Sequence, residues 1–102
     1  MIIVIAAIQL ADGRRDDFLN AFHRLVPTVR KEAGCLEYGP AVDAVTDIAA
    51  QQSPRENVVT VVEKWESVSA LKAHLTAPHM AEYRITVQDM VLGMTLQILE
   101  PA

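Results

Sequence analysis

Two histidines lie close together in the second half of the chain, His74 before Pro78 and His79 directly after it. They follow an apolar run that ends in Trp65, the only tryptophan. Because the unperturbed pKa of imidazole is roughly 6.5, a histidine can take up or release a proton near neutral pH. Imidazole, indole and apolar surface in one short stretch predict a small-molecule pocket, with His74 or His79 as catalytic base or substrate anchor. The alternative is structural: histidines at helix ends, hydrogen-bonded to backbone around Pro78.

Four further residues are candidates for contacts to a substrate. Tyr38 and Tyr83 carry hydroxyls that can donate to a substrate oxygen, and Tyr83 follows His79 by one helical turn, which makes their side chains neighbours. Met80 offers an adaptable pocket wall. Arg84 is the one obvious cation for a phosphorylated substrate. The alternatives are tyrosine hydroxyls at the rim of the fold and a methionine in an ordinary core.

Trp65 has two interpretations of similar weight. In the first it lines the pocket and stacks on an aromatic ligand. In the second it is a core tryptophan at a strand end, with its N–H bonded to a nearby group.

A metal site is not predicted. The three histidines lie on separate segments, and no His-x-His or Glu-x-x-His pair occurs. His23 is interpreted as a structural or surface residue. Cys35 is the single cysteine, which excludes an internal disulfide and a cysteine-rich metal site. It has no flanking histidine or lysine to lower its pKa, so an inert buried thiol is expected.

Length and composition narrow the class of protein. A chain of 102 residues has room for one domain, here residues 1–102. The net charge of −4 argues against nucleic acid or an anionic membrane as partner. Apolar residues make up 51% of the chain, which is more than the core of so small a domain can bury. The surplus apolar surface predicts contact with a partner subunit. The first apolar run, residues 2–10, is too short to span a bilayer, so a cytoplasmic protein is expected.

The helices and strands that position these side chains can be predicted from the spacing of apolar residues and from capping residues, glycines and prolines. In residues 2–10 both alternating sets are apolar, Ile3, Ile5 and Ala7 on one face and Ile2, Val4, Ala6 and Ile8 on the other, which indicates a strand covered on both sides. A helix is expected over residues 12–33, capped by Asp12, bent at Pro27 and ended by Gly34. The remaining predictions are a strand over 35–45, a polar connection over 46–57, a strand over 58–65, a helix capped by Ser67, a helix from Pro78 to Gly93 and a strand over 94–100.

In the helix after Ser67, the residues expected to point inward are Val68, Leu71 and Leu75, with His74 at the flank. The order β-α-β-β-α-β is typical of the ferredoxin-like α+β fold, a four-stranded antiparallel sheet with helices on one face. The uncovered face of so apolar a first strand then predicts a homodimer, sheet against sheet.

Four segments carry a family resemblance: residues 32–38 (Glu-Ala-Gly-Cys-Leu-Glu-Tyr), 63–65 (Glu-Lys-Trp), 70–74 (Ala-Leu-Lys-Ala-His) and 78–79 (Pro-His). Over nearly its whole length the chain resembles the antibiotic biosynthesis monooxygenase family, in the dimeric α+β barrel superfamily. The resemblance implies a dimer with one pocket per subunit between sheet and helices, and oxygenation without metal, flavin or other cofactor. Two departures stand out: the segment between Tyr38 and Trp65 is longer than expected, and the first strand offers Ala6 and Ala7 where haem-degrading relatives use asparagine.

The leading functional hypothesis is a cofactor-independent monooxygenase that oxidises a quinol or phenolic aromatic. One alternative is an isomerase or other proton-transfer enzyme on a small carbonyl compound. Another is a dimer that binds a small ligand without converting it. The sequence does not separate these three.

Overall fold

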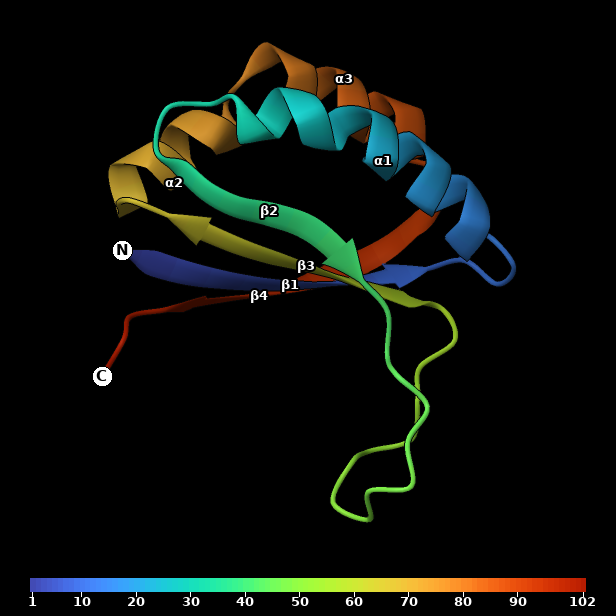
Figure 1. The fold of residues 1–102 in the computed structure, drawn as a ribbon. Helices are drawn as coiled ribbons and strands as arrows, with labels where there is room; N and C mark the ends of the chain where they lie inside the picture. The colour runs from blue at the N-terminus through green and yellow to red at the C-terminus, as the bar shows by residue number, and fades with distance from the viewer.

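The computed structural model describes residues 1–102 and contains four strands and three helices. The strands form one antiparallel sheet in the order β2-β3-β1-β4, and all the helices lie on one face of it (Figure 1). This arrangement confirms the predicted ferredoxin-like fold. In chain order the elements are β1 (Ile2–Leu10), α1 (Arg15–Arg30), β2 (Cys35–Ala41), β3 (Val58–Trp65), α2 (Val68–Leu75), α3 (Pro78–Val87) and β4 (Val91–Leu99).

The central strand β1 separates two different environments. Its even-numbered residues, from Ile2 to Leu10, are buried beneath the helices, whereas the odd-numbered ones are half-buried on the other face. The strand register places Ile5 opposite Val62 on β3 and Gln97 on β4, so these three side chains share the uncovered face. In a single chain, therefore, one face of the apolar strand is covered and the other is open (Figure 1).

The first helix is shorter than predicted because Asp12 does not cap it. The Asp12 carboxylate instead accepts a hydrogen bond from the Asn57 side chain at 3.1 Å, and α1 begins at Arg15. Pro27 lies inside the helix without ending it. The chain turns after Arg30 through Gly34, whose φ of 83° lies in the left-handed region that favours glycine. This turn carries Glu32 towards the other helices.

The predictions for the two later helices are confirmed in part: Ser67 caps α2, Leu71 is buried and α3 begins at Pro78. The Ser67 hydroxyl accepts a hydrogen bond from the Ala70 N–H, as expected of a cap. However, Val68 and Leu75 are exposed, and it is His74 that is buried beside Leu71. The helix α3 ends at Val87 rather than Gly93.

Pairing with β1 explains the early end of α3. The strand β4 begins at Val91, and Gly93 lies within it, opposite Gln9. Gly93 therefore belongs to the sheet because it pairs with a distant strand, although a glycine at this point in the sequence is typical of a helix end.

Residues 42–57 form an arm that extends beyond the sheet on the side away from the helices (Figure 1). At its base, Arg55 donates through its Nε and Nη2 atoms to both carboxylate oxygens of Asp43, at 2.8 and 3.0 Å. These hydrogen bonds hold the pKa of Asp43 down at about 2. Farther out, Val45 and Ile48 are exposed. The strand β2 accordingly ends at Ala41, before the predicted limit of residue 45.

No helix in the structure has the length and apolar character needed to cross a membrane.

Candidate active site

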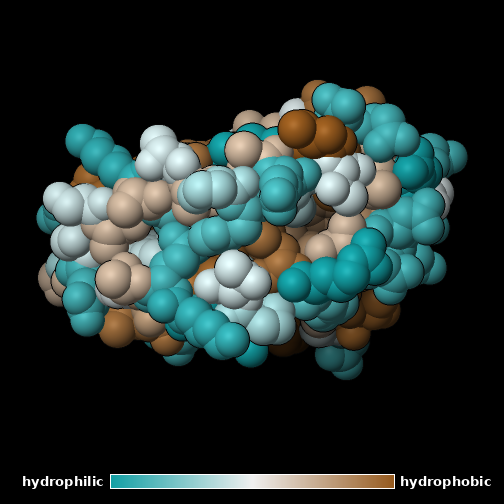
Figure 2. All heavy atoms as spheres, turned by 90° about the horizontal axis from the view of Figure 1, so that it is seen from above, coloured by the Kyte–Doolittle hydropathy of each residue, from teal (hydrophilic) through white to brown (hydrophobic).

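A cavity of about 410 Å³ lies between the sheet and the helices. Of its 18 lining residues, 14 are hydrophobic, and the other four are Glu63, His74, Arg84 and Gln88. Seen from the helical side, apolar atoms are visible between the polar side chains that cover the helices (Figure 2). A cavity of this size and composition, with few polar groups, is typical of sites for small organic molecules.

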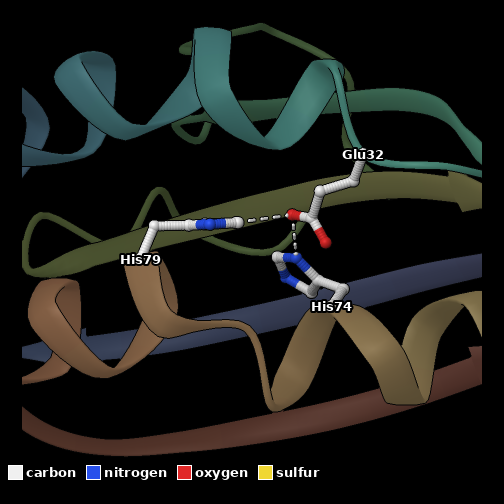
Figure 3. Close-up of side chains that lie close together, drawn as sticks. All are labelled: Glu32, His74 and His79. Atoms are coloured by element: carbon white, nitrogen blue, oxygen red, sulfur yellow. Dashed lines mark hydrogen bonds and ion pairs between the residues drawn. The ribbon is translucent and has the colours of Figure 1, made fainter.

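Glu32, His74 and His79 meet at one end of the helical layer (Figure 3). The Nδ1 atom of His74 lies 2.8 Å from Oε2 of Glu32, and the Nε2 atom of His79 lies 2.9 Å from the same oxygen. Three segments supply these side chains: the turn after α1, the last turn of α2 and the first turn of α3. The break between α2 and α3 at Thr76 and Ala77 lets both histidines reach the same carboxylate.

The hydrogen bond to Glu32 fixes which nitrogen of His74 is available to a ligand. A carboxylate accepts, so Nδ1 of His74 donates, and the neutral ring then carries its lone pair on Nε2. No protein group bonds to Nε2, although every fully buried polar side-chain atom has a partner. Since His74 lines the cavity, Nε2 is the ring nitrogen that is left free for a ligand there.

Burial keeps the His74 ring neutral. The residue is only 2% exposed, and desolvation lowers its pKa, an effect that the hydrogen bond to Glu32 partly offsets. A neutral imidazole with a carboxylate behind it can accept a proton from a group in the cavity, and the carboxylate stabilises the imidazolium that forms.

A second carboxyl group, Glu63, lies in the cavity wall on β3. Its burial raises its pKa to about 7, although a hydrogen bond from the Trp65 Nε1 atom at 2.8 Å acts in the opposite direction. Near neutral pH this carboxyl group can therefore be protonated and act as a hydrogen-bond donor. The cavity thus combines a neutral base with a weak acid.

Of the two interpretations of Trp65, the pocket-lining one is wrong and the core one is confirmed, because its indole is fully buried behind the wall and its N–H bonds to Glu63. The ring centroid of Trp65 lies 4.8 Å from that of His74. The tryptophan therefore supports two cavity residues, His74 through ring contact and Glu63 through its N–H. It does not touch the cavity itself.

Most of the predicted substrate contacts do line the cavity: Tyr38, Met80, Tyr83 and Arg84. The Tyr38 and Tyr83 hydroxyls bond to no protein group, and burial raises the pKa of both, so both stay protonated and can donate. Arg84 is partly engaged, since its Nη2 donates to the backbone oxygen of Leu75 at 2.8 Å. His79 does not line the cavity and is connected to it only through Glu32 and His74.

Two functional candidates, Glu32 and Glu63, were not among the residues predicted. Glu63 is the one charged residue at the inward-facing positions of β3, which otherwise hold Val59, Val61 and Trp65, and this is a detectable signal. Glu32 has no such signal in its own segment. The spacing of histidines along the chain predicts no metal site. In space, however, Glu32, His74 and His79 each bring one possible ligand atom to within 4.8 Å of the other two.

A second hollow, of about 510 Å³, lies along β2 and is lined by residues that include Arg30 and Glu37. It contains no imidazole and no buried carboxylate. The chemistry is concentrated in the cavity beside His74.

The fold and the cavity define a ferredoxin-like α+β protein with a small-molecule site between sheet and helices. The sequence profile of the family described as "Antibiotic biosynthesis monooxygenase" matches residues 1–84, and the chain belongs to this family. It is 41% identical to the "Probable quinol monooxygenase YgiN" of Escherichia coli K12, in an alignment that covers 99% of this chain and 98% of that protein.

Solved structures share the fold at low sequence identity. The chain superposes on PA3566 from Pseudomonas aeruginosa with a TM-score of 0.81 at 22% identity, covering 99% of this chain and 93% of that one. It superposes on a putative antibiotic biosynthesis monooxygenase from Nitrosomonas europaea with a TM-score of 0.82 at 16% identity, covering 99% and 98%.

Proposed function

We propose that this protein is a cofactor-independent quinol monooxygenase in which His74 is the catalytic base. The observation that carries the proposal is the Glu32–His74 pair, which presents a free Nε2 atom to an apolar cavity. The name of the Escherichia coli relative, which describes a probable quinol monooxygenase, supports the substrate class. Membership of the family supports the reaction class.

The reaction begins with proton transfer. The Nε2 atom of His74 takes the proton of a quinol hydroxyl, and Glu32 stabilises the positive charge that develops on the ring. The quinolate is a much better electron donor than the neutral quinol. It can therefore give one electron to O₂ without a flavin or a metal.

The remaining steps balance with quinol and O₂ alone. The semiquinone and superoxide combine to form a C–O bond at a ring carbon, and His74 returns its proton to the peroxide. Cleavage of the O–O bond, with loss of hydrogen from the same ring carbon, releases water and leaves the keto form of a hydroxyquinone. One quinol and one O₂ thus give one hydroxyquinone and one water, and the substrate itself is the reductant.

The other polar groups of the cavity fit the anion that this route creates. Protonated Glu63 and the Tyr38 and Tyr83 hydroxyls can donate hydrogen bonds to the quinolate oxygens. Apolar walls exclude water, so the radical pair stays together until it recombines. Met80 and its apolar neighbours contact the aromatic ring.

We further propose that the protein acts as a homodimer. The uncovered sheet face carries the apolar side chains of Ile3, Ile5 and Ala7 along its central strand. A second copy of the same face can bury them, and the helical layer and its cavity then remain free in both subunits.

Proton transfer on a small carbonyl compound is the second candidate. The same cavity holds a neutral base, His74, and a weak acid, Glu63, which is the pair that an enolisation requires. The cavity is less suited to a phosphorylated substrate. Arg84 is the only cation that lines it, and this side chain already donates a hydrogen bond to the backbone oxygen of Leu75.

The deciding experiment measures O₂ consumption with a panel of hydroquinones in chelator-treated buffer, using ¹⁸O₂ to follow the oxygen atom. The proposal requires uptake above autoxidation and one labelled oxygen in the product. It also requires a loss of about 10²–10⁴-fold in the His74→Gln variant. His23→Gln, on the outer face of α1, is the matched control and should retain full activity.

Three outcomes would count against the monooxygenase. Hydrogen–deuterium exchange into a diketone without O₂ consumption would favour the isomerase. Tight retention of an unmodified aromatic without turnover would favour a binding protein. Equal rates in wild type and His74→Gln would exclude His74 as the base.

A further inference from the structure

Glu32, His74 and His79 converge on a single point from three separate segments. One ligand atom from each lies within 4.8 Å of the other two. Both imidazoles approach the same carboxylate oxygen, whereas the other oxygen, Oε1, has no hydrogen-bond partner. Among the ion pairs of the structure, Glu32 takes part only in those with the two histidines, so no lysine or arginine competes for it.

We propose that Glu32, His74 and His79 form a binding site for a divalent transition-metal ion such as Zn²⁺, and that the bound ion inhibits the enzyme. Two imidazoles and a carboxylate are a ligand set that suits Zn²⁺ and its neighbours. The inhibitory effect rests on the proposed function, whereas the binding itself does not.

The spacing fits an ion after small movements. Ligand atoms at about 2.1 Å from a tetrahedral metal lie roughly 3.4 Å apart. The present N···O separations of 2.8 and 2.9 Å are those of N–H···O hydrogen bonds and must widen by about half an ångström. The two histidine nitrogens lie within 4.8 Å of each other, and side-chain rotations that bring them closer complete the site. In each neutral histidine the proton moves from the nitrogen that faces Glu32 to the other ring nitrogen, and a lone pair takes its place.

The ion has a path to the site. The His79 side chain is 26% exposed and that of Glu32 is 15% exposed, whereas His74 is almost fully buried. An ion can therefore approach from solvent past His79, and a water molecule can take the remaining coordination position.

Metal binding changes what His74 presents to the cavity. A neutral imidazole carries one N–H, so a metal ion on Nδ1 leaves the proton on Nε2. The atom that faces the cavity is then a hydrogen-bond donor and can no longer take a proton from a quinol. Occupation of the site therefore removes the base without blocking the cavity.

Binding is tested by titrating Zn²⁺ into chelator-treated protein in a calorimeter. We expect one Zn²⁺ per chain in the wild type. Affinity should fall at least about tenfold in His79→Ala and in Glu32→Gln, and stay unchanged in His23→Ala. His79 is partly exposed, so His79→Ala is expected to fold even where Glu32→Gln does not. Circular dichroism checks this for each variant.

Absence of saturable binding in the wild type would overturn the proposal. So would equal binding in wild type and folded His79→Ala, or loss of binding in His23→Ala.

Inhibition is measured separately. Zn²⁺ should suppress quinol oxidation with a midpoint that matches the calorimetric Kd, and His79→Ala should need at least about tenfold more Zn²⁺ for the same effect. Stimulation by Zn²⁺ would contradict the inhibitory role. If the protein oxidises no quinol at all, the calorimetric result still decides whether the site exists.

Discussion

The rings of Trp65 and His74 lie in contact, with centroids 4.8 Å apart and planes inclined by 35°. The same indole donates its N–H to Glu63 at 2.8 Å. One buried tryptophan therefore positions both the proposed base and the weak acid of the cavity. This relationship explains how a side chain that touches no ligand can matter to the chemistry.

Replacing Trp65 by phenylalanine should keep the ring contact and remove the hydrogen bond to Glu63. That bond lowers the pKa of Glu63, so its loss should raise this pKa above about 7. Carboxyl ¹³C NMR titration measures the change. Chemical denaturation should show a loss of about 1–3 kcal/mol, and the loss should shrink in a Glu63→Leu background, where the indole N–H has no acceptor at this position. An unchanged pKa of Glu63 would contradict the assigned role of the indole.

Replacing Glu32 by glutamine should separate its two proposed roles, which are to orient the His74 ring and to stabilise the imidazolium by its charge. The amide can still accept a hydrogen bond, but it no longer stabilises an imidazolium. We expect kcat to fall by about 10–100-fold with little change in KM, as for other residues that orient a reacting histidine. ¹⁵N NMR of the His74 ring reports which nitrogen carries the proton. Equal kcat in the variant and the wild type would mean that His74 works without Glu32.

Glu63 should make the stability of the protein fall as pH rises. Its pKa of about 7 in the folded chain exceeds the ordinary value of 4.5, so the folded chain holds a proton that the unfolded chain has released. Its contribution is complete below about pH 4.5 and is lost as pH rises through about 7, with a total change of about 3 kcal/mol.

Burial lowers the pKa of His74. This shift has the opposite effect to that of Glu63, because it lowers the free energy of unfolding as pH falls. The free energy of unfolding of the wild type minus that of Glu63→Gln isolates the effect of the carboxyl group. Urea denaturation at a series of pH values gives both curves. Parallel curves for the two proteins would rule out the assigned ionisation of Glu63.

Gly34 should tolerate no side chain. Its φ is 83°, and an added Cβ atom would lie 2.7 Å from the Cβ atom of Ala70 on α2. We expect Gly34→Ala to lower the free energy of unfolding by about 2–4 kcal/mol through strain and overpacking. Gly13→Ala is the matched control, because its φ is also positive but nothing lies within 4 Å of the added atom. Equal losses in both variants would show that the contact with α2 carries no cost.

The proposed dimer predicts that a charge on the open sheet face will separate the subunits. Ile5→Lys places an ammonium at the centre of that face, where a second copy would have to bury it. Sedimentation velocity should show a dimer for the wild type and a monomer for the variant. Ile85→Lys, at an exposed position on α3, should remain dimeric. A monomeric wild type would refute the proposed assembly.

Local patterns predicted most of the fold. The β-branched run of β3 and the hydroxyl of Ser67 act within their own segments, and both predictions hold. Errors arose where a distant residue decides the outcome. Asn57 takes the Asp12 carboxylate away from the helix, and pairing with Gln9 draws Gly93 into the sheet.

The same distinction separates what was predicted of the site from what was missed. His74 was identified from its type and its apolar surroundings. Its partner Glu32 lies 42 positions earlier in the chain, and only the packing of α2 against the turn after α1 brings the two together. For Trp65 the sequence leaves a pocket position and a core position both open, because alternation along a strand gives the face of a residue and not what lies above it.

The edge strand β4 bears on which molecules the cavity can take. Its side chains Met94 and Leu96 share the helix-facing side of the sheet with Ile8 and Ala6, yet they are 56% and 42% exposed. Both also line the cavity, which is therefore open along this strand. A ring can sit beside His74 while a long hydrocarbon tail runs out across β4. We therefore expect selection by size to act on the head group alone, so that the proposed monooxygenase accepts quinols with and without a tail.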